Sequence, residues 1–253
     1  ILSGILIVAA SLKIGLFLTD AISFNSDEAI VALMAKHILE GGRPVFFYGQ
    51  AYMGSLDAYL GAFSFWLLGE TVWAIRIVQL LLYLGTIVTT VWVGRVVFNS
   101  DSIGLIAGGL LAIPTVNVTL YTTASLGGYG EALLIGNLIL LVGWQLKLLL
   151  QREFHDENIR PNHLLWFVYG GLVGLGLWAN GLTLIYSIPS VLILIYSFRR
   201  QFNKKHLVKI SIGLTGFFLG SLAWWVYAFQ FGLNSLIFEL LGSAVSVETG
   251  SFL

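Results

Sequence analysis

Two adjacent carboxylates, Asp27 and Glu28, follow an apolar segment at residues 1–19, in the stretch "FNSDEAIVALMAKHILEGG" at 24–42. A carboxylate at the edge of a membrane can act as a general base toward an acceptor hydroxyl. The position can also be purely structural, because acids in the first turn of a helix gain about 0.3–1 kcal/mol from its dipole. These residues alone leave both interpretations open.

A second acid and two cations stand close to or within other apolar segments. Glu131 follows "YTTASLGGYG" and opens such a segment, where acids tend to mark function, although it too could serve a helix dipole. Arg76 and Lys13 lie inside apolar segments, where a cation can bind a phosphate or can extend its charged end to the interface. The set therefore offers a base and two candidate ligands for a phosphate.

An aromatic loop with glycines follows the acidic pair. It reads "RPVFFYGQAYMG" at residues 43–54, and an anchor that only held the chain to a membrane surface would not need it. We expect four polar or aromatic side chains in and just after this loop to contact a substrate: Tyr48, Gln50, Tyr52 and Asp57.

Composition assigns the chain to the membrane proteins. Of its 253 residues, 57% are hydrophobic and only 10% are charged, with a mean hydropathy of +0.88, whereas a soluble domain needs more polar surface. The 13 basic and 13 acidic residues balance, so no net field favours nucleic acid. The absence of cysteine excludes disulfides and thiolate metal sites, and it suits a prokaryotic plasma (inner) membrane. We expect the sequence to be the N-terminal part of a longer protein.

The apolar runs predict an all-α, multi-pass membrane protein with about seven transmembrane helices in a single domain, residues 1–253. A span needs about 20 apolar residues, and the long run at 164–198 is divided by "WANG", an Asn-Gly turn signal at 178–181. The predicted spans are 1–19, 72–94, 103–120, 131–149, 164–180, 182–198 and 207–231.

The distribution of basic residues predicts which side each loop faces. Most Lys and Arg residues fall in loops that share one side with the N-terminus, which the positive-inside rule makes cytoplasmic. The carboxylates Asp27, Glu28 and Glu131 are then extracytoplasmic. An alternative has the N-terminus outside and an eighth span at 54–69, which would turn Asp27 and Glu28 toward the cytoplasm.

The outer loop at 20–71 is predicted to contain two interfacial amphipathic helices, at 26–40 and 54–68. Asn25 or Ser26 is the expected N-cap of the first, with Glu28 placed as in a capping box.

Three stretches together resemble a known superfamily of membrane enzymes. They are "SDEAIVALMAKHILEGGRPVFFYGQAYMGSLDAYLGAFSFWLLG", "AIRIVQLLL" and "GGYGEALLIGNL", roughly a third of the chain. They resemble the GT-C membrane glycosyltransferases, and within them glycosyltransferase family 39, the protein O-mannosyltransferases and aminoarabinose-transferase-like proteins. The resemblance implies an inverting transfer of a sugar from a polyprenyl-phosphate-linked donor to a lipid, glycan or protein acceptor.

The resemblance also implies roles for particular residues. Asp27 and Glu28 match the acidic pair of the family's first outer loop, and Glu131 corresponds by position to an acid of its second outer loop. Arg76 and Lys13 are candidates for the lipid phosphate because of their depth and charge. A helix N-terminus stabilises a charged carboxylate and weakens it as a base, so Asp27 could instead orient the acceptor, or bind a divalent metal (Mg, Mn or Zn) together with Glu131.

Two other classes of function remain as alternatives. A lipid-linked-sugar flippase or small transporter would need polar residues at mid-membrane depth and an internal repeat, and we find no repeat. A scaffold subunit would contact membrane lipids and need no acid at position 27.

Overall fold

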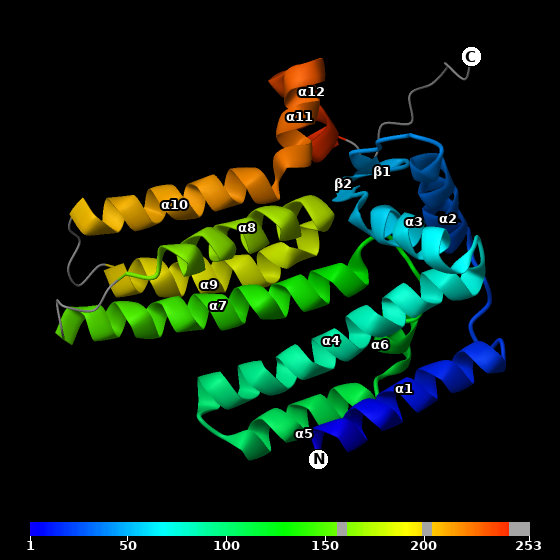
Figure 1. Ribbon diagram of the computed structural model, residues 1–253, viewed down its shortest axis with the longest axis horizontal. Helices are drawn as coiled ribbons and strands as arrows, with labels where there is room; N and C mark the ends of the chain where they lie inside the picture. Colours follow the sequence, from blue (N-terminus) through cyan, green and yellow to red (C-terminus); the bar gives the residue numbers. More distant parts are fainter. Residues whose placement is uncertain (156–160, 199–203, 243–253) are drawn as a thin grey trace.

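The computed structural model describes residues 1–155, 161–198 and 204–242, and these are mostly helical (Figure 1). The helices are α1 (Leu2–Leu18), α2 (Ser26–Leu39), α3 (Leu56–Leu68), α4 (Val72–Phe98), α5 (Asp101–Ala112), α6 (Val116–Tyr121), α7 (Tyr129–His155), α8 (His163–Ala179), α9 (Leu184–Phe198), α10 (Lys204–Gly220), α11 (Leu222–Phe231) and α12 (Leu233–Gly242), with a 3-10 turn, η1 (Gly181–Thr183). The expected all-α class is confirmed.

Three of the described helices are long and apolar enough to cross a membrane. They are α4, the segment Tyr129–Glu153 of α7, and the segment Gly181–Phe198 formed by η1 and α9. A fourth follows if α10 and α11, which meet at a bend of 68°, form one span. Helices α1 and α8 have 17 residues each, which is about 26 Å of helix against a hydrocarbon core of about 30 Å. These helices indicate a membrane protein.

Two of the expected spans are broken in the structure. The run 103–120 forms α5 and α6, separated at residues 113–115, because Pro114 has no backbone N–H and disfavours helical geometry in the residue before it. The run 207–231 bends between α10 and α11. There Ser221 donates a hydrogen bond from Oγ to the Phe217 carbonyl oxygen at 2.8 Å, an interaction that often bends helices.

The segment 20–71 contains two helices close to the expected bounds, α2 and α3. The Asn25 side chain caps α2, since its Oδ1 accepts hydrogen bonds from the backbone N–H groups of Asp27 and Glu28, each at 3.0 Å. The expected capping box does not form, because the Glu28 carboxylate bonds to Arg76 instead. Between α2 and α3 lies a small antiparallel hairpin that the sequence did not predict, β1 (Phe46–Phe47) and β2 (Gln50–Gly54).

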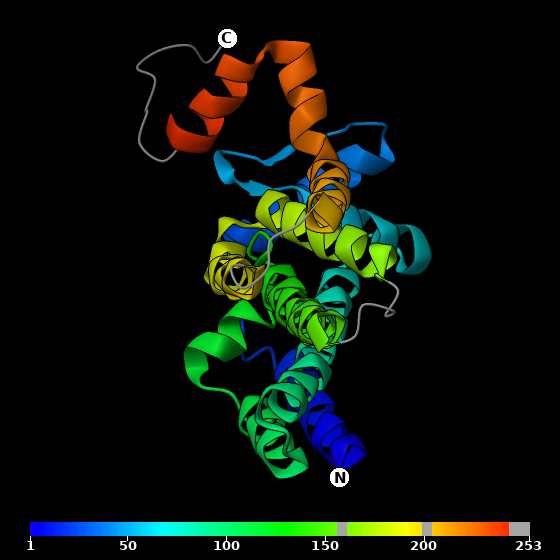
Figure 2. The same cartoon turned by 90° about the vertical axis from the view of Figure 1, so that its left-hand side faces the viewer.

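The elements divide between two ends of the helical bundle. Helices α7, α8, α9 and α10 run side by side, α4 packs against α7, and α1 and α5 pack against α4 on the side away from them (Figures 1 and 2). Helices α2 and α3 and the hairpin gather at one end, where α7 begins and α8 ends, while the α4–α5 turn and the start of α10 lie at the other (Figure 1). Loops far apart in the sequence therefore meet at one end of the molecule.

Candidate functional site

Asp27 lies in the first turn of α2 and borders a cavity of about 340 Å³. The N-cap bonds of Asn25 fix this turn, and the Asp27 side chain is half-buried. Among the described residues, the Asp27 carboxylate has no hydrogen-bonding or ion-pair partner. The segment 20–71 supplies one wall of this cavity, which besides Asp27 is formed by Asn25, Phe47, Gln50, Tyr52 and Met53.

The opposite wall comes from the connection between α6 and α7 and the helix ends that flank it. Leu120, Tyr121, Leu126 and Tyr129 line it, and the rings of Tyr121 and Tyr129 lie 4.6 Å apart at an interplanar angle of 39°. On the first wall, the Tyr52 hydroxyl donates to Oε1 of its neighbour Gln50 at 2.7 Å. Asp27 is the one charged side chain among the described residues of the lining. The cavity thus combines a carboxylate, amides and aromatic faces, the groups that bind polyhydroxylated ligands.

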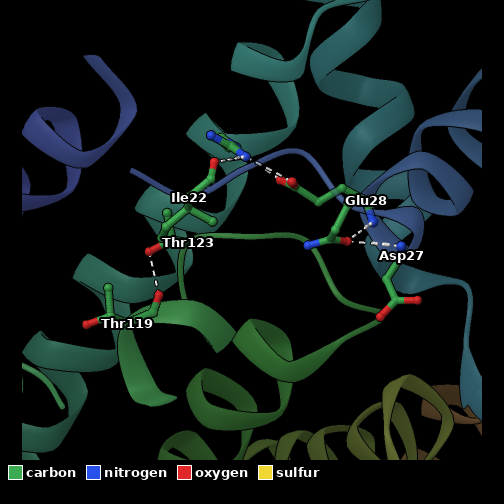
Figure 3. A network of polar contacts seen from close by, with 7 residues as sticks. Ile22, Asp27, Glu28, Thr119 and Thr123 are labelled. Carbon is green, nitrogen blue, oxygen red and sulfur yellow. Dashed lines mark hydrogen bonds and ion pairs between the residues drawn. The ribbon is translucent and has the colours of Figure 1, made fainter. Parts of the chain in front are cut away.

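Glu28 is buried and faces away from the cavity. Its two carboxylate oxygens accept hydrogen bonds from Arg76, from Nε at 3.0 Å and from a terminal guanidinium nitrogen at 2.9 Å. The same nitrogen donates to the Ile22 carbonyl oxygen at 3.0 Å. Figure 3 shows the carboxylates of Asp27 and Glu28 pointing in different directions, away from each other. The Glu28–Arg76 pair therefore ties the start of α2 to α4, and the geometry does not support the expected roles of Glu28 in catalysis and Arg76 in phosphate binding.

Lys13 is also occupied by protein groups. Its Nζ donates to the Thr119 carbonyl oxygen at 3.1 Å and to the hydroxyl of Thr122 at 2.6 Å, with a further bond to the Thr123 hydroxyl. Nζ also lies 4.4 Å from the centroid of the Tyr83 ring. The side chain is 1% exposed, so it is enclosed by the protein, and its part in binding a donor phosphate stays a prediction without geometric support.

Asp57 lies in the first turn of α3 and is buried beneath residues 125–128 of the α6–α7 connection. Its Oδ1 accepts a hydrogen bond from Gln79 at 3.0 Å, and its Oδ2 accepts from the Ser125 hydroxyl at 2.7 Å. Oδ2 also accepts from the backbone N–H groups of Gly127 at 3.1 Å and Gly128 at 3.2 Å. Burial raises the pKa of Asp57, and the hydrogen bonds from Ser125 and the two glycines oppose that rise. Asp57 thus contacts the α6–α7 connection and does not line the cavity.

Glu131 follows in the first turn of α7 and is 1% exposed. Its carboxyl lies beside that of Asp57, with which it interacts electrostatically and by a side-chain hydrogen bond. It does not line the cavity beside Asp27. In the described part of the chain no group of three or more His, Asp or Glu side chains could hold a metal, and an ion shared by Asp27 and Glu131 stays a prediction that this arrangement does not support.

The structure therefore brings together only some of the expected site residues. Asp27, Gln50 and Tyr52 share the cavity. Tyr48 points elsewhere, with its hydroxyl 3.1 Å from His37 Nδ1.

Two kinds of residue were missed by reasoning from the sequence. Tyr121 and Tyr129 flank the α6–α7 connection, residues 122–128, which ends in two glycines. An aromatic residue at each end of such a connection was an available signal. Asn180 was interpreted as a simple turn residue, but it is buried and its Nδ2 donates to the Gly127 carbonyl oxygen at 3.2 Å. Nothing in the local sequence reveals that contact, which joins the α8–η1 turn to the α6–α7 connection.

Comparison with known proteins adds no further guide: no family model, curated protein or solved structure matches the chain.

Proposed function

We propose that the protein is an inverting glycosyltransferase that moves a sugar from a polyprenyl-phosphate-linked donor to an acceptor on the extracytoplasmic side of the membrane. The observation that carries the proposal is the unpartnered Asp27 carboxylate in a cavity lined by aromatic rings and amides. The resemblance to GT-C enzymes, in which an acid of the first outer loop is catalytic, supports the same assignment.

The lining of the cavity favours the sugar or the acceptor over the donor's phosphate. No Lys or Arg is found among the described residues that line it, whereas phosphate binding relies on cations or clustered N–H donors. Asn25, Gln50 and the tyrosine hydroxyls can instead exchange hydrogen bonds with sugar hydroxyls.

In the proposed reaction the acceptor hydroxyl attacks the anomeric carbon as the carbon–oxygen bond to the polyprenyl phosphate breaks. The leaving phosphate takes the bonding electron pair. Asp27 orients the acceptor hydroxyl and accepts its proton as the new bond forms, the contribution expected of a positioned general base. Attack on the face opposite the leaving group inverts the anomeric centre.

We further propose a seven-span topology with the cavity outside. In support, Arg95, Arg152 and Lys209 belong to helix ends that lie opposite α2, α3 and the hairpin in the described parts of the bundle (Figure 1). Such segregation is what the positive-inside rule requires of cytoplasmic ends. The proposed location is an inner or plasma membrane.

Sugar transfer by purified full-length protein tests the function. In proteoliposomes supplied with a panel of undecaprenyl-phosphate-linked radiolabelled hexoses and amino-pentoses, we expect Asp27→Asn to lower turnover at least about 100-fold, because the amide cannot accept the proton.

The matched control is Asp20→Asn, the same substitution at an exposed position in the same outer loop. Its turnover should equal that of the wild type. Full activity in Asp27→Asn would contradict the proposed role, and transport of the labelled lipid without transfer would favour a flippase.

A further inference from the structure

The second wall of the cavity is one short stretch of chain, residues 119–129, which we call the wall segment. It supplies Leu120, Tyr121, Leu126 and Tyr129 to the cavity that contains Asp27. Apart from α6 and the first residue of α7, it has no regular secondary structure. Something other than a helical hydrogen-bond ladder must therefore fix its position.

Two buried charges bond to the wall segment from different elements. Lys13 of α1 bonds to Thr119, Thr122 and Thr123 at its beginning. Asp57 of α3 bonds to Ser125, Gly127 and Gly128 nearer its end. Figure 3 shows Thr119 and Thr123 next to each other, where the Thr123 hydroxyl also donates to the Thr119 carbonyl oxygen.

Both charges depend on the wall segment for most of their polar contacts. Within the described residues neither side chain forms an ion pair, and both are 1% exposed. Besides the bond that it shares with Glu131, Asp57 accepts four hydrogen bonds, and three of them come from the segment, as do all three that Lys13 donates. Bonds between an ionised and a neutral group are stronger than neutral ones. If the segment moved away, Lys13 would lose all three of its hydrogen bonds and Asp57 three of these four, and loss of partners by buried polar groups is costly.

We propose that Lys13 and Asp57 are positioning residues that together hold the wall segment in place and so set the shape of the cavity facing Asp27. A cation fixes the start of the segment and an anion fixes its end. The consequence for catalysis rests on the proposed function, but the mechanical role does not. In this assignment Lys13 acts through the threonines and touches no substrate.

Cysteine labelling tests the mechanical role directly, because the protein has no cysteine of its own. Ala124 lies within the wall segment and is 0% exposed, so Ala124→Cys reports opening of the segment. In the full-length protein in detergent, we expect Lys13→Met or Asp57→Asn to raise the rate of labelling by a maleimide about tenfold or more, since the first removes the donors at one end and the second replaces a charged acceptor at the other by a weaker neutral amide.

The matched control is Lys36→Met, which removes a cation from the exposed Lys36–Glu70 pair on the same side of the molecule. It should leave the labelling rate unchanged. Unchanged labelling in both Lys13→Met and Asp57→Asn overturns the proposal, and so does an equal rise in the control. If the charge variants do not fold, as judged by gel filtration, Thr123→Val and Ser125→Ala decide the question by the same reading.

Kinetics separates positioning from a general loss of structure. In the transfer assay, Lys13→Met and Asp57→Asn should raise KM for donor or acceptor about tenfold with a smaller change in kcat, because the cavity wall is displaced while Asp27 remains. Partial unfolding would instead lower apparent kcat at constant KM. Faster labelling of the charge variants, in a protein whose wild type shows no transferase activity, would support the positioning role of Lys13 and Asp57 and contradict the proposed function. Unchanged labelling in an active enzyme would overturn only the positioning role.

Discussion

Asp27 and Glu28 are neighbours in the chain but lie in opposite environments. Successive residues of a helix point about 100° apart, so α2 turns Glu28 into the protein, toward Arg76, and Asp27 toward the cavity. Both oxygens of the Glu28 carboxylate are occupied by the Arg76 guanidinium. Glu28 therefore has a structural task, and only Asp27 is available for the chemical task that the proposed function requires.

The Glu28–Arg76 pair makes a prediction about stability. Both side chains are at most 5% exposed, and removing one partner of a buried pair leaves an uncompensated charge at a cost of about 3–5 kcal/mol. We expect Glu28→Gln and Arg76→Met each to lower the free energy of unfolding by this order, as measured by titration with a denaturing detergent.

A double-mutant cycle gives the control for this prediction. Glu28→Gln combined with Arg76→Met should cost less than the sum of the single changes, since no charge is left unpaired. Glu70→Gln, in the exposed Lys36–Glu70 pair, should change stability by less than about 0.5 kcal/mol. Additive effects at positions 28 and 76 would show that the two side chains do not stabilise each other.

At the scale of elements, α8 and α10 pack with their backbones in close contact. A Cβ atom placed on Gly170 would lie 1.8 Å from the Gly213 carbonyl oxygen, and one on Gly174 would lie 2.2 Å from the Phe217 carbonyl oxygen. Small residues permit this approach between helices in a membrane, where packing rather than the hydrophobic effect drives association. Glycine at these positions is therefore required by α10, not by α8 itself.

The helix pair can be tested with one methyl group. We expect Gly170→Ala to destabilise the protein by about 1–3 kcal/mol, because α10 must shift to admit the new Cβ atom. Gly109→Ala, in α5, is the matched control, since no atom lies within 4 Å of the Cβ position there. The control should be neutral or slightly stabilising, and equal effects at the two sites would contradict the close packing of α8 against α10. The detergent titration measures both.

For the molecule as a whole, the consequential prediction concerns which side of the membrane the cavity faces. A cysteine at Ser26, which is exposed next to Asp27, and in a separate variant one at Lys204 should respond differently to a membrane-impermeant maleimide added to intact cells. We expect labelling at position 26 and none at 204, because basic residues are retained on the cytoplasmic side.

The opposite outcome is equally informative. Labelling at position 26 only after the cells are opened would place Asp27 in the cytoplasm, favour the eight-span alternative with a span at 54–69, and exclude transfer from a donor in the outer leaflet.

Patterns local in the chain predicted much of the architecture. Long apolar runs required helices, since a backbone in lipid must satisfy its own hydrogen bonds. The Asn25 cap and the two helices α2 and α3 follow from short-range signals. The hairpin at β1 and β2 was not predicted, and the run 103–120, predicted as one span, breaks beside Pro114. In both cases tertiary contacts or a single proline outweighed a hydrophobicity average over many residues.

The composition and the order of residues by themselves determined that this is a helical membrane protein with an acidic pair just after its first apolar segment. They could not determine which acid is free, because that depends on Arg76, which lies 48 positions from Glu28 in sequence. Nor could they show that Lys13 and Asp57 both bond to residues 119–129, since neither spacing nor periodicity records a contact between distant segments. Only the tertiary structure decided these points, because the pairing of a buried charge is settled by whichever groups the fold brings within hydrogen-bonding distance.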